Sequence, residues 1–226
     1  MAYSSVIFDM DGVLLNSLVD GEKWKYRAVD RALKEKDVEP ENVSRDGKDA
    51  ILGDKGYKAC LKKSSKLGLD PREIWSLVAQ ETTNARGEEL RKGNFELYPE
   101  AEKVVKNLHQ KDIPLAVISN APEAAVKMMI EYFELKQYFK FFAGVRNFED
   151  LRDRKPHPNH LELAKAELKR DPFIYVGDSD SDLKAAENAR MDSVWVKRGG
   201  EVQNGHTFEV EGLGEIVNRV VEDQSE

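Results

Sequence analysis

Five short, largely continuous apolar runs constrain the fold of this chain more than any other feature of its sequence. A strand buried on both faces is apolar throughout, whereas a strand with one exposed face alternates between apolar and polar residues. The runs therefore predict the buried strands of a parallel sheet. They are Val6–Phe8, Leu115–Ile118, Phe139–Val145, Phe173–Val176 and Val194–Val196.

Amphipathic helical patterns accompany the later runs. Apolar residues recur at helical spacing over residues 104–108, 126–133, 161–168 and 213–220. Pro99, Pro122 and Pro158 precede the first three patterns, and proline is favoured in the first turn of a helix. Strands that alternate with helices predict βαβ units, and thus an α/β fold with right-handed crossovers.

Residues 17–95 interrupt this alternation. They contain no convincing strand, but helical patterns extend over residues 24–33, 57–67 and 71–90. The turn signals "VEPEN" and "KLGLDP" separate these patterns. We therefore predict a core made of residues 1–16 and 96–226, with an all-helical insert, residues 17–95, placed after the first strand.

Polar side chains follow three of the apolar runs, at the points where the strands are expected to end. Ligands bind outside the carboxyl ends of the strands in an open α/β sheet. We therefore expect these side chains to converge at one edge of the sheet, together with a lysine that precedes a helix. They are Asp9 and Asp11 after the first run, Ser119 and Asn120 after the second, Asp178 and Asp182 after the fourth, and Lys155.

Four short motifs carry these residues in order along the chain: "DMDGV", "SN", "KP" and "GDSDSD". With them the sequence resembles the haloacid dehalogenase superfamily of phosphohydrolases, in the branch with a helical cap after the first strand. "SN" and "KP" are common by chance, whereas "FDMDGVL" after a strand is specific, and the four motifs together are more so. The resemblance covers nearly the whole chain and implies a Rossmann-like sheet with strand order 5-4-1-2-3.

The resemblance accounts for the two crowded carboxylates of the first motif. Side-by-side carboxylates at the end of a buried strand are unfavourable, unless a divalent cation neutralises them. Mg²⁺ prefers hard oxygen ligands and reduces the repulsion between a phosphate and an anionic nucleophile. The resemblance implies that Asp9, Asp178 and the backbone carbonyl of Asp11 bind Mg²⁺. Asp182 would order a metal-bound water or orient Lys155.

The resemblance also implies the catalytic roles. Asp9 would be the nucleophile that forms an aspartyl-phosphate, and Asp11 would protonate the leaving alkoxide and then activate water. Lys155 would neutralise the charge that grows in the transition state. The substrate phosphate would be held by Ser119, Asn120, Gly12 and Lys155.

Substrate choice is expected to come from the helical insert. The stretch "SRDGKDAILGDKGYKACLKK" carries Arg45, Lys48, Lys55 and Lys58 around two glycine turns. Arg45 and Lys48 are the candidates for contacting the leaving group of an anionic substrate. The alternative is a solvated basic helix face.

Composition excludes several other classes of protein. A net charge of −7 argues against general binding of nucleic acid, which needs a basic surface. No apolar run approaches the ~20 residues of a membrane span, and the N-terminus does not resemble a secretion signal. The single cysteine, Cys60, fits a reducing cytoplasm.

The sequence therefore predicts a cytoplasmic, Mg²⁺-dependent phosphatase that hydrolyses a small phosphorylated metabolite, of the phosphoglycolate or sugar-phosphate type, as a monomer or a homodimer. A phosphomutase similar to β-phosphoglucomutase would keep all four motifs and differ only in its cap. A 2-haloacid dehalogenase would lack the second aspartate, so Asp11 argues against it. A binding protein without catalytic activity is the remaining alternative.

Overall fold

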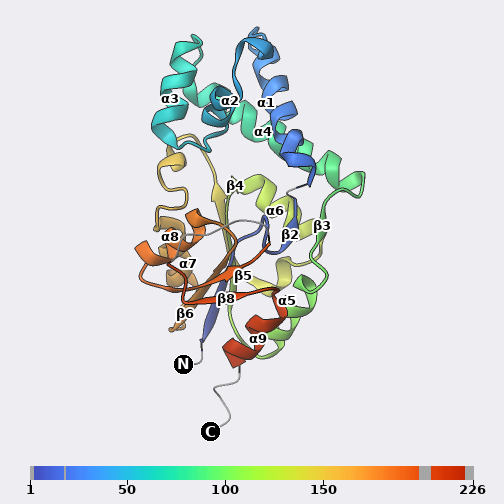
Figure 1. Cartoon of the computed structure of the whole chain (residues 1–226), viewed down its shortest axis with the longest axis vertical. Helices are drawn as coiled ribbons and strands as arrows, with labels where there is room; N and C mark the ends of the chain where they lie inside the picture. The colour runs from blue at the N-terminus through green and yellow to red at the C-terminus, as the bar shows by residue number, and fades with distance from the viewer. Residues whose placement is uncertain (1–2, 18, 199–204, 222–226) are drawn as a thin grey trace.

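The computed structural model describes residues 3–17, 19–198 and 205–221, and these form a sheet with helices on both faces (Figure 1). The sheet has six strands in the order β5-β4-β1-β6-β7-β8, and all neighbouring strands are parallel. The five predicted strands are, in chain order, β1, β4, β5, β6 and β7, so the predicted order 5-4-1-2-3 corresponds to β7-β6-β1-β4-β5 and is confirmed. Strand β8 is an additional edge strand. The strands are β1 (Ser5–Phe8), β4 (Leu115–Pro122), β5 (Phe139–Val145), β6 (Phe173–Gly177), β7 (Asp192–Val196) and β8 (Phe208–Val210).

The two faces of the sheet bury alternate side chains of the central strand. Val6 and Phe8 of β1 belong to an apolar cluster with α5 (Ala101–Gln110), α6 (Glu123–Tyr132) and α9 (Gly214–Val221). Ile7 points to the other face, where it packs with α7 (Asn159–Leu168) and α8 (Asp180–Asn188). Burial on both faces explains why residues 6–8 of β1 are apolar without interruption.

Strand register aligns the carboxyl ends of the three central strands. Phe8 pairs with Val117 of β4 on one side and with Val176 of β6 on the other. The residues that follow these pairs therefore emerge together at one edge of the sheet.

Helices α1 (Lys23–Glu35), α2 (Arg45–Leu52), α3 (Tyr57–Lys66) and α4 (Pro71–Arg91) lie beyond this edge (Figure 1). The three predicted helices correspond to α1, α3 and α4. These helices enclose an apolar cluster of their own, which includes Val29, Ile51 and Ile74. The short strands β2 (Leu15–Asn16) and β3 (Glu96–Leu97) pair antiparallel where the chain enters and leaves the helical segment.

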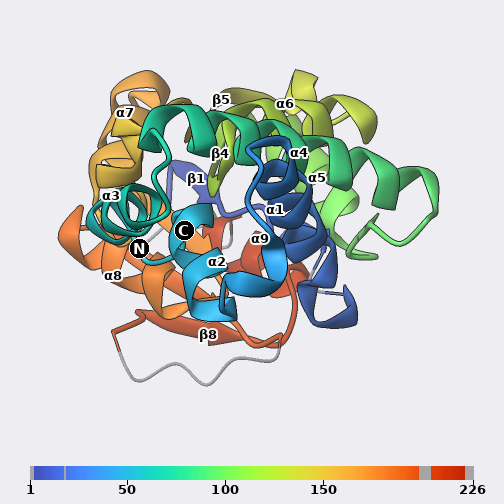
Figure 2. The same ribbon diagram turned by 90° about the horizontal axis from the view of Figure 1, so that it is seen from above.

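Helix α4 is the long element that joins the helical segment to the rest of the molecule; in the view from above it passes beside β4 and α6 (Figure 2). An apolar cluster connects the two parts. In it, Cys60 of α3 and Trp75 of α4 pack with Val145, Phe148 and Leu151. Cys60 is therefore a packing residue at this contact.

Short 3₁₀ helices occupy Val19–Glu22, Pro40–Asn42, Lys136–Tyr138 and Glu149–Arg152. Among the helices of the described part of the chain, none combines the length and the apolar character that crossing a membrane requires.

Candidate active site

The carboxyl edge of the sheet gathers the predicted polar side chains. Asp9 follows β1, Ser119 lies within β4 and Asp178 follows β6. The backbone N–H of Asp9 donates to the carbonyl of Val176 at 2.8 Å, so the strand pairing continues up to the first carboxylate.

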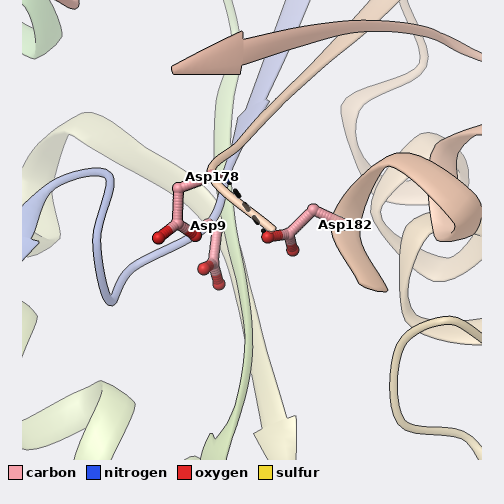
Figure 3. A group of neighbouring side chains, drawn as sticks. All are labelled: Asp9, Asp178 and Asp182. Atoms are coloured by element: carbon pink, nitrogen blue, oxygen red, sulfur yellow. Dashed lines mark hydrogen bonds between the residues drawn. The ribbon is translucent and has the colours of Figure 1, made fainter. Parts of the chain in front are cut away.

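Asp9, Asp178 and Asp182 form a compact group of carboxylates (Figure 3). One oxygen from each lies within 4.8 Å of the others, and Asp9 and Asp182 are buried. Asp178 donates its backbone N–H to Oδ2 of Asp182 at 3.3 Å, which is the hydrogen bond drawn in Figure 3. The loop after β6 and the first turn of α8 are therefore held against the end of β1.

Burial and mutual repulsion disfavour the charged forms of two of these carboxylates. Burial raises the pKa of Asp9 well above its usual value despite the opposing charge of Lys155, and the neighbouring carboxylates act in the same direction as burial. Burial and the nearby Asp182 raise the pKa of Asp178 to about 7. Crowded carboxylates of this kind fit a hard divalent cation, which would remove the repulsion.

Lys155 is the buried cation of the site. Its Nζ lies 2.6 Å from Oδ1 of Asp9, 2.5 Å from Oδ1 of Asp182, 2.8 Å from the hydroxyl of Tyr175 and 3.2 Å from the carbonyl of Ile118. Burial alone would lower the pKa of Lys155, but Asp182 and Asp9 raise it above the usual value, so this lysine remains charged.

Asp182 uses both of its carboxylate oxygens within the protein. Oδ1 accepts from Lys155 and from the Tyr175 hydroxyl at 2.9 Å. Oδ2 accepts from the Ser179 backbone N–H at 3.1 Å, within a capping box that begins α8. Burial would raise the pKa of Asp182, but Lys155 outweighs it and the pKa is lowered. The geometry therefore favours orientation of Lys155 over direct metal ligation for Asp182.

Asp11 faces the helical segment and is held by two side chains. Arg86 of α4 donates from Nη1 to Oδ1 at 2.7 Å and from Nη2 to Oδ2 at 2.9 Å, and Ser17 donates to Oδ1 at 2.5 Å. The Arg86 guanidinium also stacks on the Trp24 ring at 4.7 Å. Burial would raise the pKa of Asp11, but the charge and hydrogen bonds of Arg86 lower it.

Ser119 and Asn120 have different surroundings. Ser119 is buried, and its Oγ accepts from the backbone N–H of Ala121 at 3.1 Å, which leaves its own O–H available as a donor. The Asn120 amide accepts from the backbone N–H of Lys155 at 2.9 Å and donates to the Lys155 carbonyl at 3.1 Å. Asn120 therefore fixes the loop that carries Lys155.

Gly12 brings the first loop close to the second. Its φ is +80°, and an added Cβ would collide with the Asp178 carboxylate. Glycine adopts positive φ without a steric cost. The sequence analysis placed Gly12 next to a phosphate, and the structure adds close contact with Asp178 as a reason for glycine here.

A cavity of about 370 Å³ lies between these residues and the helical segment. This volume suits a small metabolite. Its floor includes Asp9, Asp178, Ser119 and Lys155; its roof includes Trp24, Trp75, Thr82 and Arg86; and its rim includes Lys25, Asp54 and Arg154.

The four motif segments thus meet in one cavity at the carboxyl edge of a parallel sheet, and a family model described as haloacid dehalogenase-like hydrolase matches residues 6–196. The chain belongs to the haloacid dehalogenase-like hydrolase family. The resemblance noted from the motifs is therefore confirmed, and the chain is an enzyme of this hydrolase family.

Two curated relatives of this haloacid dehalogenase-like hydrolase are named phosphoglycolate phosphatase. The protein from Cereibacter sphaeroides is 30% identical over 187 residues, which cover 82% of this chain and 81% of the relative. The protein from Photorhabdus laumondii is 26% identical over 193 residues, which cover 82% of this chain and 76% of the relative.

Solved structures of similar proteins support the fold. CbbY from Rhodobacter sphaeroides in complex with phosphate gives a TM-score of 0.71 at 19% identity, covering 95% of this chain and 96% of CbbY. An HAD phosphatase from Thermococcus onnurineus gives 0.68 at 20% identity, covering 96% of each chain.

The basic residues expected to select the substrate lie elsewhere. Neither Arg45 nor Lys48 lines the cavity. Arg45 stacks on Tyr26 and donates to its hydroxyl at 3.2 Å, and Lys48 pairs with Asp30 at 2.5 Å. Both partners, Tyr26 and Asp30, belong to α1, so the two side chains extend from α2 to α1. Lys55 and Lys58 do not line this cavity but line a wider cleft that adjoins it and shares Lys155 and Arg154 with it.

Three contacts of the site have no counterpart in the sequence analysis: those of Tyr175, Arg86 and Ser17. Of these, Tyr175 carries a signal in the sequence, because it is a hydroxyl-bearing residue inside an apolar strand. The burial of Arg86 in α4 is seen only in the structure. A polar side chain in such a position needs a partner, and a carboxylate at the sheet edge is the available one.

Proposed function

We propose that this protein is a Mg²⁺-dependent phosphatase that hydrolyses a small phosphate monoester through an aspartyl-phosphate on Asp9. The observation that carries the proposal is the group formed by Asp9, Asp178 and Lys155 at the sheet edge. It supplies a nucleophilic carboxylate, a second carboxylate for a cation and a buried positive charge, all around one cavity.

The carboxylates of Asp9 and Asp178, with the backbone carbonyl of Asp11, would hold Mg²⁺. When bound, the ion would neutralise the repulsion between Asp9 and the substrate phosphate. Asp182 would act from the second coordination shell, and its two hydrogen-bonded oxygens support that role.

In the first step, a carboxylate oxygen of Asp9 attacks phosphorus and the bond from phosphorus to the ester oxygen breaks. Asp11 must be in its protonated form for this step, and it transfers its proton to the departing alkoxide. In the second step, Asp11 accepts a proton from a water molecule as that water attacks phosphorus, which releases phosphate and restores the Asp9 carboxylate.

The phosphoryl oxygens are expected to contact Lys155, the Ser119 hydroxyl and the backbone near Gly12. Donors that are already in place stabilise charge as it develops in the transition state. Asn120 would contribute through its two hydrogen bonds to the Lys155 backbone, which fix the position of that lysine.

Residues 17–95 would act as a cap domain on a core of residues 1–16 and 96–226. Roof side chains from α1 and α4 would exclude bulk water during catalysis. The names of the relatives favour phosphoglycolate as the substrate, and the cavity volume would also fit a sugar phosphate. The single cysteine fits a location in the cytoplasm.

Phosphate release from a panel of monoesters, with Mg²⁺ and with EDTA, tests the proposal. The panel contains phosphoglycolate, hexose phosphates, nucleoside monophosphates and an aryl phosphate. We expect Mg²⁺-dependent release that Asp9→Asn abolishes and Asp180→Asn preserves, since Asp180 is exposed beside the same cluster. Isomerisation of a sugar phosphate without net phosphate release would instead indicate a phosphomutase, and release in EDTA would contradict the metal requirement.

A further inference from the structure

Arg86 is bound to the carboxylate of Asp11, which the proposed mechanism needs as its acid and base. Its Nη1 and Nη2 bind the two oxygens of Asp11 at 2.7 and 2.9 Å, and Ser17 binds one of the same oxygens. A bidentate arginine leaves little of a carboxylate free to exchange protons with a leaving group. Arg86 and Ser17 thus hold the Asp11 carboxylate, and the acid–base role proposed for Asp11 would require Arg86 to release it.

The other cations that line the cavity already have partners on its floor or rim. Lys155 binds Asp9 and Asp182 on the floor. At the rim, Asp54 accepts from Arg154 at 3.1 Å and lies 3.5 Å from Lys25.

Arg86 differs from these cations because it comes from the roof and meets the residue assigned to the leaving oxygen. Its side chain is 8% exposed, and its buried Nε has no hydrogen-bond acceptor among the described residues. A guanidinium with an unused donor can bind a further or a different anion, and its planar fork matches the geometry of a carboxylate or a phosphate.

Only another anion can replace Asp11 at little cost, because removing one partner of a buried ion pair strands the other charge. The phosphoryl group itself is expected on the floor, at Lys155 and Ser119. The anion that reaches Arg86 must then be carried by the leaving part of the substrate.

We propose that Arg86 is a specificity residue that selects phosphate monoesters with a second acidic group, a carboxylate or a phosphate, on the leaving part. That group exchanges with Asp11 as the partner of Arg86 and so frees Asp11 for catalysis. The inference rests on the proposed phosphatase function. A neutral leaving group offers no such exchange and leaves Asp11 bound.

Two esters of similar size test the inference: phosphoglycolate, which carries a carboxylate, and 2-hydroxyethyl phosphate, which is neutral at that end. Phosphate release with Mg²⁺ gives kcat/KM for each ester, and the ratio of the two values is the preference of a given protein for phosphoglycolate. Dividing the preference of wild type by that of a variant cancels the intrinsic difference in reactivity between the two leaving alcohols. Wild type is compared with Arg86→Met, with Arg86→Lys and with Arg91→Met, an exposed arginine of the same helix.

We expect wild type to prefer phosphoglycolate by at least about tenfold, the scale of one charge-assisted contact. Arg86→Met should lose most of this preference, through slower turnover of phosphoglycolate with unchanged or faster turnover of the neutral ester. Arg86→Lys should lie between them, because it keeps the charge but not the fork, and Arg91→Met should match wild type.

Several results would overturn the inference without affecting the proposed phosphatase function. Equal use of both esters by wild type would do so, and this measurement needs no variant to fold. A preference for phosphoglycolate that is unchanged in Arg86→Met would also overturn the inference. If Arg86→Met does not fold, an unchanged preference in Arg86→Lys has the same meaning. Release from neither ester nor any other monoester by wild type would instead reject the phosphatase function itself.

Discussion

Tyr175 shows how one buried hydroxyl organises the charged groups of the site. It lies on β6, is fully buried, and contacts both Lys155 at 2.8 Å and Asp182 at 2.9 Å. Burial and the neighbouring carboxylates raise the pKa of Tyr175 well above its usual value, so the hydroxyl stays protonated. It donates a hydrogen bond to Asp182. Tyr175 is therefore a positioning residue for the lysine.

Replacing Tyr175 with Phe should slow catalysis more than it weakens substrate binding. Lys155 would keep its charge but lose one of the contacts that fix its Nζ, so we expect kcat to fall about tenfold, equivalent to about 1.4 kcal/mol, with KM within about twofold. Steady-state phosphate release measures both constants. The matched control is Tyr132→Phe, whose ring is 56% exposed. A fall in kcat/KM that results from a higher KM with unchanged kcat would contradict a positioning role.

The residues of the site differ in how far the sequence could reveal them. Asp9, Asp178 and Lys155 were predictable because each lies in a short motif, and the first two directly follow apolar strands. Arg86 was not, because its partner Asp11 lies 75 positions away and helical spacing does not predict which elements will meet. The contact depends on how α4 packs, which is a tertiary property.

At the scale of elements, α4 combines a strong start with a polar interior. Asp70 accepts hydrogen bonds from the backbone N–H groups of Arg72 at 2.8 Å and Glu73 at 3.0 Å, and Pro71 occupies the first turn. Further along, Thr82, Arg86 and Glu89 are buried. The helix places these polar groups on its inner face, and its capped first turn helps to stabilise it.

Replacing Asp70 with Ala should destabilise the protein while leaving the chemistry intact. Loss of a helix N-cap costs about 1 kcal/mol, which corresponds to about 2–4 °C in Tm for a chain of this size. Asp70→Asn keeps an acceptor and should remain near wild type. Thermal unfolding followed by circular dichroism measures the change, and kcat on the preferred ester should stay within about twofold. A variant as stable as wild type would show that the cap is dispensable.

The elements also differ in how well their sequences predict them. Strands β1, β4, β5, β6 and β7 each contain a run of mostly apolar residues that can be recognised on its own. Strand β8 has only three residues with an exposed glutamate at its centre, and β2 and β3 have two residues each. Such short segments carry no periodicity of their own and pair only because the chain around them is already placed.

For the molecule as a whole, apolar packing and a few ion pairs join the helical segment to the rest of the chain. Trp24 of α1 and Ala85 and Leu90 of α4 belong to the main apolar cluster, and Cys60 and Trp75 pack in the smaller one described above. Arg86 pairs with Asp11, Arg154 with Asp54 at 3.1 Å and Arg72 with Glu149 at 2.5 Å. The last pair is exposed and contributes little, whereas the first is largely buried and directional. The most buried of these three ion pairs therefore lies within the candidate active site itself.

Global stability should depend jointly on pH and Mg²⁺ through the same carboxylates. The pKa of Asp178 is raised from 3.8 to about 7 in the folded protein, and that of Asp9 is raised in the same direction. Between about pH 4 and pH 7 the metal-free folded state therefore binds more protons than the unfolded state, so its stability falls as pH rises.

Mg²⁺ binds the ionised carboxylates and must displace these protons at low pH. We therefore expect Mg²⁺ to raise Tm by several degrees at pH 8 and by much less at pH 5.5, because the stabilisation follows the ratio of free ion to the apparent dissociation constant. Thermal unfolding with Mg²⁺ and with EDTA at the two pH values measures this. Asp178→Asn should remove most of the Mg²⁺ effect and part of the pH dependence, whereas Asp180→Asn should retain both. An equal Mg²⁺ effect at both pH values would mean that these carboxylates are already ionised at pH 5.5, and that charge neutralisation does not explain their crowding.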